Sequence, residues 1–344
     1  MTNKNVIYII NCLFDDEWHR REDARNYLLK NREHVSDEFI NFIFDTHWES
    51  DCQEEWSKIT TYHIEKYAES VGADLVELNN SDLTKMNLPP SFYQYQKANW
   101  LKFHALKQFA SSDYEKALYL DLDILVTKDA PDIFKEKKEK GFYINHDGFL
   151  LAIKSAQGKL KKYFGLEVEL AQMNKWDEEP KEERVKHFED NSLYNGGAWL
   201  FDRETAQEFC SVVPDDDEWM SFFSEVGLGE NEHDDLDREI MDQDLWLYFS
   251  KISKIKPKYL GTEWNAGLAC CFDHIRGGPM LARYFIHFFG GGSPPHIRDL
   301  LLFLNDKEAG KPKMDRFCSL ITEDKVYTLP KPTEASEPKV RTCR

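Results

Sequence analysis

Two aspartates that directly follow an apolar run are the residues of this sequence with the clearest chemical use. Residues 117–120 (Ala-Leu-Tyr-Leu) are followed by Asp121 and Asp123, with one residue between them. Since alternate residues of an extended chain point to the same side, both carboxylates can face one crevice. Hard oxygen ligands on one side suit a divalent cation such as Mg²⁺ or Mn²⁺. The same pattern also fits a strand end whose acidic side chains are merely solvated.

The elements expected around these aspartates alternate between strands and helices. Short apolar or alternating runs predict strands at residues 6–10, 39–44, 73–78 and 117–120. Apolar residues at helical spacing predict helices at residues 59–70 and 97–109, with Leu101, Ala105, Leu106 and Phe109 on one face. Such interleaving is typical of βαβ units and predicts an α/β fold with a mainly parallel sheet. Ligands bind at the carboxyl ends of the strands in such sheets, where Asp121 and Asp123 lie.

Composition excludes several classes of protein. The net charge of −18 argues against binding to a phosphate backbone, so we expect no nucleic-acid partner. No apolar run approaches the roughly 20 residues of a membrane span, and the run at residues 6–10 is too short for a signal peptide. The seven cysteines follow no repeating frame, which predicts reduced thiols. We therefore expect a soluble protein of the cytoplasm, or of the cytoplasm of a host cell.

The acidic residues are concentrated in one stretch of the chain. Residues 215–244 hold 13 acidic residues and one basic residue, a net charge of −12. This composition fits either a solvated surface or a flap that helps to recognise an acceptor. From about residue 305 onward, prolines interrupt the chain and its apolar content falls. We therefore expect one domain over residues 1–304 and a peripheral tail over residues 305–344.

The predicted helix and the strand that ends at Asp121 also carry a wider pattern. Residues 96–106 (QKANWLKFHAL) and residues 114–126 (YEKALYLDLDILV) together resemble the core of glycosyltransferase family 8. In that family, a helix bears a donor-contacting Arg or Lys and a strand ends in a metal-binding Asp-x-Asp motif. The resemblance places Lys102 as the basic residue, with Lys97 as the alternative, and places Asp121 and Asp123 on the metal.

A glycine pair follows in the order expected for this family. Residues 194–202 contain Asn195, Gly196 and Gly197, which are similar to the family's Asn-Ala-Gly strand with glycine in place of alanine. The resemblance places all three at the donor, because a backbone without side chains allows a sugar to approach closely. An ordinary turn or bulge would also account for the two glycines.

A third motif lies in the acidic stretch. Asp242, Gln243 and Asp244 are similar to the family's Asp-Gln-Asp, which supplies the acid and the amide nearest the reacting anomeric carbon. The resemblance therefore implies that these three residues are catalytic. The alternative is a helix N-terminus, where acidic residues are favourable.

The fourth motif lies close to the end of the expected domain. Residues 284–290 (YFIHFFG) resemble the family's His-Phe-x-Gly, and residues 261–265 resemble, more weakly, the stretch before it. The resemblance implies that His287 is the third protein ligand of the metal and that Gly290 approaches the diphosphate. A histidine among aromatic residues is otherwise a common core residue.

Together the four motifs imply a GT-A fold, which is a Rossmann-like α/β fold with a mixed, mostly parallel sheet flanked by helices. They imply a retaining hexosyltransferase that takes a nucleotide-sugar donor, most often a UDP-sugar, and a glycan or glycoconjugate acceptor. Asp121, Asp123 and His287 would hold Mn²⁺ or Mg²⁺. The sequence does not exclude weak oligomerisation.

One position departs from the family's pattern. Ser293 stands where the family has a lysine that neutralises the diphosphate. Backbone amides of the glycine run could replace that charge as an anion nest, or Arg276, His296 or Arg298 could supply it. Two other functions remain in view: a catalytically weak nucleotide-sugar-binding protein, and a Mg²⁺-dependent phosphatase of the haloacid-dehalogenase type, which also places Asp-x-Asp after a strand.

Overall fold

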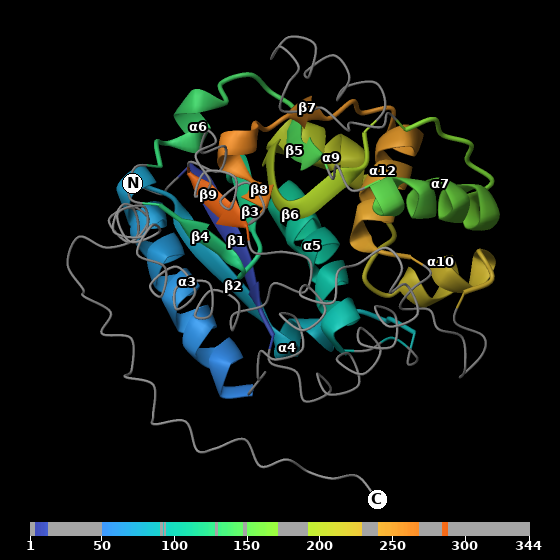
Figure 1. The fold of residues 1–344 in the computed structure, drawn as a ribbon, viewed down its shortest axis with the longest axis horizontal. Helices are drawn as coiled ribbons and strands as arrows, with labels where there is room; N and C mark the ends of the chain where they lie inside the picture. The colour runs from blue at the N-terminus through green and yellow to red at the C-terminus, as the bar shows by residue number, and fades with distance from the viewer. Residues whose placement is uncertain are drawn as a thin grey trace, which may run out of the picture.

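The computed structural model describes residues 4–12, 50–89, 92, 94–127, 130–146, 150–170, 192–228, 240–267 and 284–287. The strands are β1 (Asn5–Asn11), β2 (Asp74–Asn79), β3 (Lys116–Leu120), β4 (Ile124–Val126), β5 (Phe142–His146), β6 (Tyr194–Asp202), β7 (Lys258–Tyr259), β8 (Ala266–Gly267) and β9 (Phe285–His287) (Figure 1). The helices are α3 (Ser50–Val71), α4 (Asn80–Leu83), α5 (Gln94–Ala110), α6 (Ile133–Glu136), α7 (Leu150–Phe164), α9 (Arg203–Cys210), α10 (Trp219–Glu225) and α12 (Asp242–Ser253), with a short 3₁₀ turn, η2 (Thr262–Trp264).

The main sheet has six strands in the order β2-β1-β3-β6-β5-β7. β1 is parallel to both β2 and β3, and β5 is parallel to β7, whereas β6 runs antiparallel to β3 and β5. β6 is therefore the single reversed strand of an otherwise parallel sheet. A second sheet has the order β4-β9-β8. This arrangement confirms the predicted α/β fold with a mixed, mostly parallel sheet.

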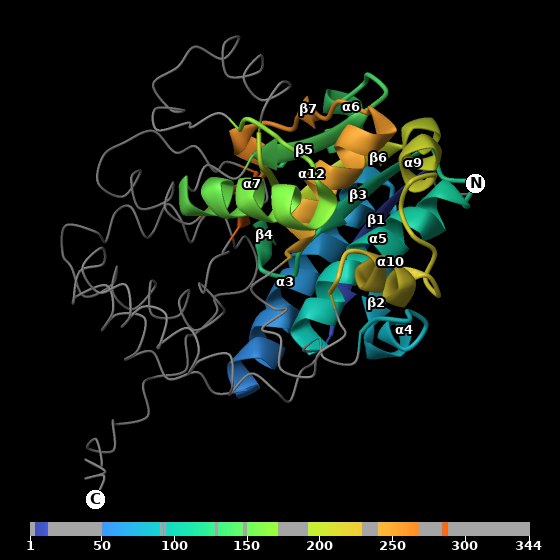
Figure 2. The same ribbon diagram turned by 90° about the vertical axis from the view of Figure 1, so that its right-hand side faces the viewer.

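Alternate residues of the strands contribute to two separate hydrophobic cores. In β1, Val6 and Tyr8 face one core while Ile7 and Ile9 face the other, as the two-residue repeat of a strand requires. The first core is closed by α5, α9 and α12, and the second by α3 and the small sheet. In Figure 1, α3 lies on one side of the main sheet and α5, α9 and α12 lie on the other. Figure 2 shows α7 and α12 together in front of β6.

Helix α5 is buried on more sides than its apolar pattern predicts. The predicted apolar face is confirmed, because Leu101, Ala105, Leu106 and Phe109 are fully buried. Lys102 and His104 are also buried, at 4% and 6% exposure. Aromatic rings from other helices close around α5, and Phe103 lies 4.5 Å from the ring of Trp246. The helix thus carries a lysine into the interior, which requires a partner of opposite charge.

Part of the acidic stretch is docked on the body of the protein. His104 Nδ1 lies 2.7 Å from Asp216 Oδ2, and Lys107 pairs with Asp215. The backbone N–H of Asn87 also donates to the carbonyl of Asp216, at 2.7 Å. The start of this stretch is therefore held against α5 and the segment after α4, whereas residues 229–239 lie outside the described part.

Two predicted segments cannot be compared with the structure. The strand at residues 39–44 and the tail at residues 305–344 lie outside the described residues, so both stay predictions. Among the helices that are described, none is both long enough and apolar enough to cross a membrane.

Candidate functional site

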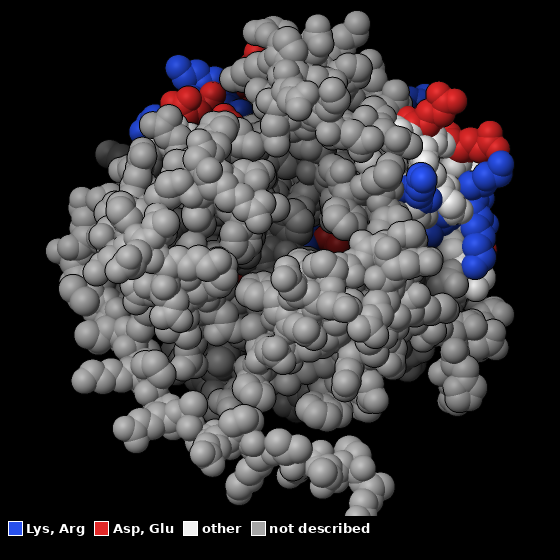
Figure 3. Space-filling model, in the orientation of Figure 1, with Lys and Arg blue, Asp and Glu red and all other residues white. Residues whose placement is uncertain are grey.

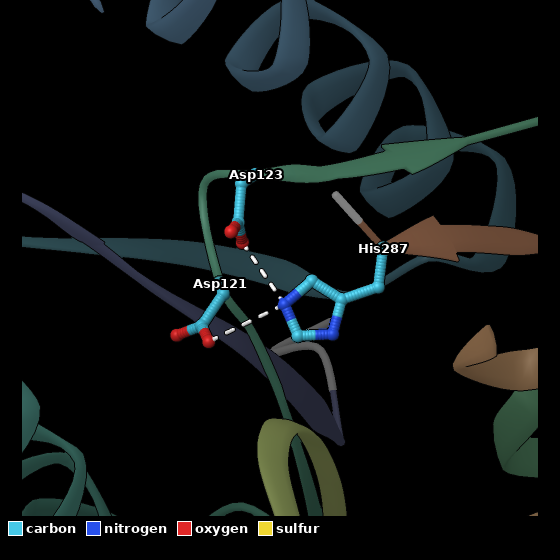
Figure 4. A group of neighbouring side chains, drawn as sticks. All are labelled: Asp121, Asp123 and His287. Atoms are coloured by element: carbon cyan, nitrogen blue, oxygen red, sulfur yellow. Dashed lines mark ion pairs between the residues drawn. The ribbon is translucent and has the colours of Figure 1, made fainter. Parts of the chain in front are cut away.

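The two aspartates lie in the tight turn between β3 and β4. The backbone N–H of Ile124 donates to the carbonyl of Asp121 at 3.0 Å, so the expected extended conformation is wrong here. The carboxylates nevertheless face a common point, because the turn curls around it (Figure 4). The backbone N–H of Asp121 also donates to the carbonyl of Gly197 at 2.7 Å, which ties the turn to β6.

His287 reaches this turn from a distant part of the sequence. It ends β9, which pairs antiparallel with β4 so that His287 lies opposite Ile124. Its Nε2 lies 3.1 Å from Asp123 Oδ1 and 3.8 Å from Asp121 Oδ2 (Figure 4). One ligand atom from each of the three residues falls within 4.8 Å of the others. We call Asp121, Asp123 and His287 the metal group.

The chemistry of the metal group suits a divalent cation. Two carboxylates and one imidazole form a donor set of the kind that binds Mn²⁺ or Mg²⁺. Asp123 Oδ1 is buried and accepts no hydrogen bond of good geometry within the described residues. A buried carboxylate oxygen in that condition is costly unless a cation or another partner compensates it. The side chains of Asp121 and Asp123 are 23% and 33% exposed, so a cation can enter from solvent.

The two carboxylates differ in their electrostatic surroundings. Burial raises the pKa of Asp121 above its usual value, and the nearby Lys102 offsets this only in part. Burial acts in the same direction on Asp123, but the facing His287 and the nearby Lys102 together outweigh it, so the pKa of Asp123 lies below its usual value. Tyr119 also donates a hydrogen bond to Asp121 Oδ1. Asp123 is therefore the carboxylate that stays ionised most readily.

Lys102 bridges the metal group and the N-terminus of α12. Its Nζ donates to Asp242 Oδ2 at 2.8 Å and to Asp121 Oδ2 at 3.2 Å. Burial lowers the pKa of this lysine, but the two carboxylates outweigh burial and raise the pKa above its usual value. Lys102 is therefore a buried positive charge beside Asp121, and its role as the family's donor-contacting basic residue stays a prediction. Lys97 lies five residues earlier on α5 and is half-buried.

The two glycines of β6 make room for two site residues. A Cβ atom at Gly196 would lie 2.4 Å from Asp242 Oδ2, and one at Gly197 would lie 2.0 Å from His287 Cε1. The glycines therefore allow Asp242 and His287 to pack directly against the strand. Sequence reasoning expected them to admit a sugar, and this packing role is a second reason for glycine at both positions.

We expect Gly197→Ala to damage the metal group. The added methyl group would overlap the imidazole of His287, which must shift away from Asp123. We expect a loss of about 1–3 kcal/mol in stability from overpacking and a fall of at least about tenfold in Mn²⁺ affinity, measured by calorimetry.

Gly158→Ala is the matched control for this substitution. Gly158 lies within α7, and an added Cβ would meet no atom within 4 Å. The control should keep wild-type Mn²⁺ affinity and gain about 0.5–1 kcal/mol of stability. Equal Mn²⁺ affinity in Gly197→Ala and wild type would contradict the geometry described above.

The Asp-Gln-Asp motif forms the first turn of α12. Asp242 faces Lys102, whereas Asp244 Oδ2 accepts hydrogen bonds from the backbone N–H of Met241 at 2.8 Å and from Lys159 Nζ at 3.2 Å. Burial raises the pKa of Asp244 despite the opposing effect of Lys159. Gln243 is half-buried between them. The predicted helix N-terminus is thus present, and it coincides with the predicted site.

Several residues around the site were not predicted from the sequence. Asn265 Oδ1 lies 2.9 Å from His287 Nδ1, and Asn145 holds the backbone of Asn265. Lys159 pairs with Asp244 from α7. The weak resemblance at residues 261–265 was the only signal that pointed to Asn265, and no local pattern indicated Asn145 or Lys159.

The structure brings together Lys102, Asp121, Asp123, Asn195, Gly196, Gly197, Asp242 and His287. The predicted diphosphate contact at Gly290, and Ser293 with the basic residues considered near it, lie outside the described residues. Figure 3 shows acidic and basic side chains at depth near the middle of this view.

Comparison with solved structures finds several glycosyltransferases of low identity. One involved in glycosylation of the major capsid of PBCV-1 is 11% identical, with a TM-score of 0.41 over 86% of this chain and 98% of that chain. Galactosyltransferase LgtC, in complex with donor and acceptor sugar analogs, is 12% identical, with a TM-score of 0.37 over 92% of this chain and 95% of that chain. Mouse xyloside xylosyltransferase 1 is 10% identical, with a TM-score of 0.38 over 82% of this chain and 97% of that chain. Because these scores are low, the family assignment rests on the sequence instead.

A search of curated protein sequences finds no match. The family model of Glycosyl transferase family 8 matches residues 24–205, which is more than half of the 344 residues. The match begins well before the first motif, which starts at residue 96. It ends before Asp242 and His287, which the fold brings to the site. The match includes Lys102, Asp121 and Asp123, and it excludes the haloacid-dehalogenase alternative. The chain belongs to glycosyl transferase family 8.

Proposed function

We propose that this protein transfers a hexosyl group from a UDP-sugar to a hydroxyl of a glycan or other glycoconjugate, with retention of anomeric configuration. The observation that carries the proposal is the convergence of Asp121, Asp123 and His287 beside the buried charge of Lys102. In a chain of this family, that convergence favours a divalent cation, Mn²⁺ or Mg²⁺, that binds the diphosphate of the donor. Retention is inferred from the family alone.

The metal group would hold the cation through one carboxylate oxygen each from Asp121 and Asp123 and through Nε2 of His287. When bound, the cation supplies Lewis-acid assistance to the departing diphosphate. Lys102 contributes a further positive charge, because its Nζ donates a hydrogen bond to Asp121 Oδ2 at 3.2 Å. Groups fixed in place before the reaction stabilise developing charge without reorganising, which is where most electrostatic catalysis comes from.

Asp242 and Gln243 are proposed to orient the sugar ring. Lys102 fixes one carboxylate oxygen of Asp242 at 2.8 Å, and Gly196 allows the side chain to lie flat against β6. Because this carboxylate already packs against Gly196, the sugar would lie beside it, near Asn195, and not between it and the strand. Asp244 completes the predicted catalytic trio, and its bonds to Met241 and Lys159 secure the turn that presents the other two.

No side chain is assigned as a general base. The departing phosphate can accept the proton of the acceptor hydroxyl, so the family's chemistry does not require one. The acceptor itself is proposed to meet the acidic stretch, of which Asp215 and Asp216 are anchored to α5. An acceptor rich in hydroxyl groups is compatible with that surface.

The proposal is tested by nucleotide release from a panel of UDP- and GDP-sugars, measured with Mn²⁺ and with EDTA. We expect one UDP-sugar to be hydrolysed or transferred with Mn²⁺ and to remain intact with EDTA. Metal-dependent UDP binding without turnover on any donor and acceptor would favour the catalytically weak binding protein. Turnover that is equal in EDTA would contradict the metal-dependent mechanism.

A further inference from the structure

A chain of buried asparagines lies behind the metal group. Asn145, Asn195 and Asn265 are 2%, 4% and 6% exposed and come from β5, from β6 and from the end of η2. Asn265 Oδ1 lies 2.9 Å from Nδ1 of His287, whose other ring nitrogen faces Asp123 at 3.1 Å. The imidazole is thus held between an amide on one side and the carboxylates on the other.

The orientation of these amides is set by a backbone N–H group, which can only donate. The N–H of Gly197 donates to Asn195 at 3.0 Å, so the accepting atom of Asn195 is its oxygen. The same oxygen lies 3.1 Å from Asn265, which must therefore present its NH₂ group there. The atom of Asn265 that faces His287 is consequently its carbonyl oxygen.

This orientation determines which ring nitrogen of His287 carries the proton. A carbonyl oxygen only accepts, so the hydrogen bond at 2.9 Å requires a proton on Nδ1. In the neutral ring, Nε2 then presents its lone pair, and Nε2 is the atom that faces Asp121 and Asp123. Metals bind the unprotonated nitrogen of a neutral imidazole.

Asn145 holds the backbone of Asn265 in place. Asn145 donates to the carbonyl of Asn265 at 2.7 Å and to that of Gly261 at 2.9 Å, and its own oxygen accepts from the N–H of Gly261 at 3.1 Å. Both ends of the Asn145 amide are therefore bound to backbone groups. These bonds fix the backbone of Asn265, and its side chain is held by its own bonds to Asn195 and His287.

We propose that Asn265 is a positioning residue that holds the proton of His287 on Nδ1 and so directs the lone pair of Nε2 toward the two aspartates. The proposal rests on the metal role of His287 in the proposed function. Partners of this kind fix the tautomer and the orientation of a ligating histidine, and their loss typically costs about 10–100-fold in metal affinity.

The tautomer is measured directly on the metal-free protein. Long-range ¹H–¹⁵N NMR of ¹⁵N-histidine-labelled protein at about pH 8, where ordinary histidines are neutral, reports which nitrogen is protonated, and His287→Gln assigns the signal. We expect Nδ1 of His287 to carry a proton and Nε2 to carry none in wild type. Asn265→Asp keeps an accepting oxygen and should keep this proton, whereas Asn265→Leu should lose it.

The affinity for Mn²⁺, followed by electron paramagnetic resonance, provides the second readout. We expect Asn265→Leu to weaken Mn²⁺ binding by about 10–100-fold and Asn265→Asp to retain it. A wild-type spectrum without a proton on Nδ1 would overturn the proposal, even if Asn265→Leu failed to fold. A folded Asn265→Leu protein with the wild-type tautomer and affinity would also overturn it. A protonated Nδ1 in a wild-type protein that binds no Mn²⁺ would instead contradict the proposed function.

Discussion

Replacing Asp123 with alanine should abolish metal-dependent turnover while leaving the fold intact. Asp123 Oδ1 accepts no hydrogen bond of good geometry within the described structure, and its close contact is with His287 of the same group, so we expect the rest of the fold to tolerate its removal. Stabilisation of a leaving group by a cation is worth several kcal/mol, so we expect a fall of about 10³-fold in nucleotide release with Mn²⁺. Because a ligand stabilises the folded state that binds it, Mn²⁺ should raise the melting temperature of wild type but not of the variant.

Asp113→Ala is the control for the loss of one aspartate. Asp113 is fully exposed, lies 3.9 Å from Arg203 and precedes β3, whose other end carries Asp121 and Asp123. The control should retain wild-type turnover and the thermal shift with Mn²⁺. If Asp123→Ala also kept both, Asp123 would not be a metal ligand and the site would need to be assigned elsewhere.

Lys102→Met should be among the most destabilising single substitutions in this protein. The lysine separates Asp121 from Asp242, and its loss leaves the buried Asp242 and the partly buried Asp121 without their cation. Removing one partner of a buried ion pair costs about 3–5 kcal/mol. Unfolding by denaturant would measure this loss, and turnover should fall with it because Asp242 is no longer held.

The stabilisation of the folded state by Lys102 should decrease as the pH rises. Asp121 and Asp242 raise the pKa of Lys102 over the opposing effect of burial. The contribution to stability is therefore fully present below the ordinary lysine pKa of about 10.4 and is lost as the pH rises through the higher folded-state pKa. The difference between wild type and Lys102→Met should accordingly persist at neutral pH and decline only in strong alkali.

Two further variants test whether the loss in Lys102→Met comes from the uncompensated carboxylates or from replacing any lysine of α5. Lys97→Met, on a half-buried position of the same helix, should change stability by no more than about 0.5 kcal/mol. Asp242→Asn should recover part of the loss in the Lys102→Met background, because the buried carboxylate is then neutral and only the partly exposed Asp121 lacks its cation. A loss below about 1 kcal/mol for Lys102→Met alone would show that the lysine is not compensating these charges.

The strands β1, β2 and β3, and the meeting of Asp121 with Asp123 at one point, could be predicted because their signals are local. The apolar run before Asp121 predicted β3, and the two-residue spacing of Asp121 and Asp123 suggested a shared ligand. The physical reason was partly wrong, since a turn rather than an extended strand brings the carboxylates together. A tight turn and a strand both place such residues on one side, so the spacing alone could not distinguish them.

The prediction that Lys102 is the basic residue of the site needed the family resemblance as well as the helical periodicity. Helical periodicity marked the apolar face of α5, and it could not show that aromatic rings would surround the rest of the helix. Lys102 is buried because Asp121 and Asp242, 19 and 140 residues away, supply opposite charge. Burial that depends on distant partners leaves no signal in a local window of sequence.

The contacts around His287 show the limit of sequence reasoning most clearly. Its motif suggested a metal ligand only by resemblance, and the pairing of β4 with β9 is what brings it opposite Ile124. Asn265 contacts His287 across 22 residues of sequence, and Asn145 contacts Asn265 across 120. Neither asparagine has a periodic or spacing pattern, so only the folded structure indicates their role.

The most direct test of the account is the binding of UDP to the wild-type protein, measured by calorimetry with Mn²⁺ and again with EDTA. UDP carries the diphosphate of the proposed donor, so the test requires neither the correct sugar nor the acceptor. We predict that UDP binds with Mn²⁺, that EDTA abolishes binding, and that Asp123→Ala binds in neither condition. Equal affinity in Mn²⁺ and EDTA, or no binding of UDP in either, would contradict a metal site built from Asp121, Asp123 and His287 that holds a nucleotide-sugar donor.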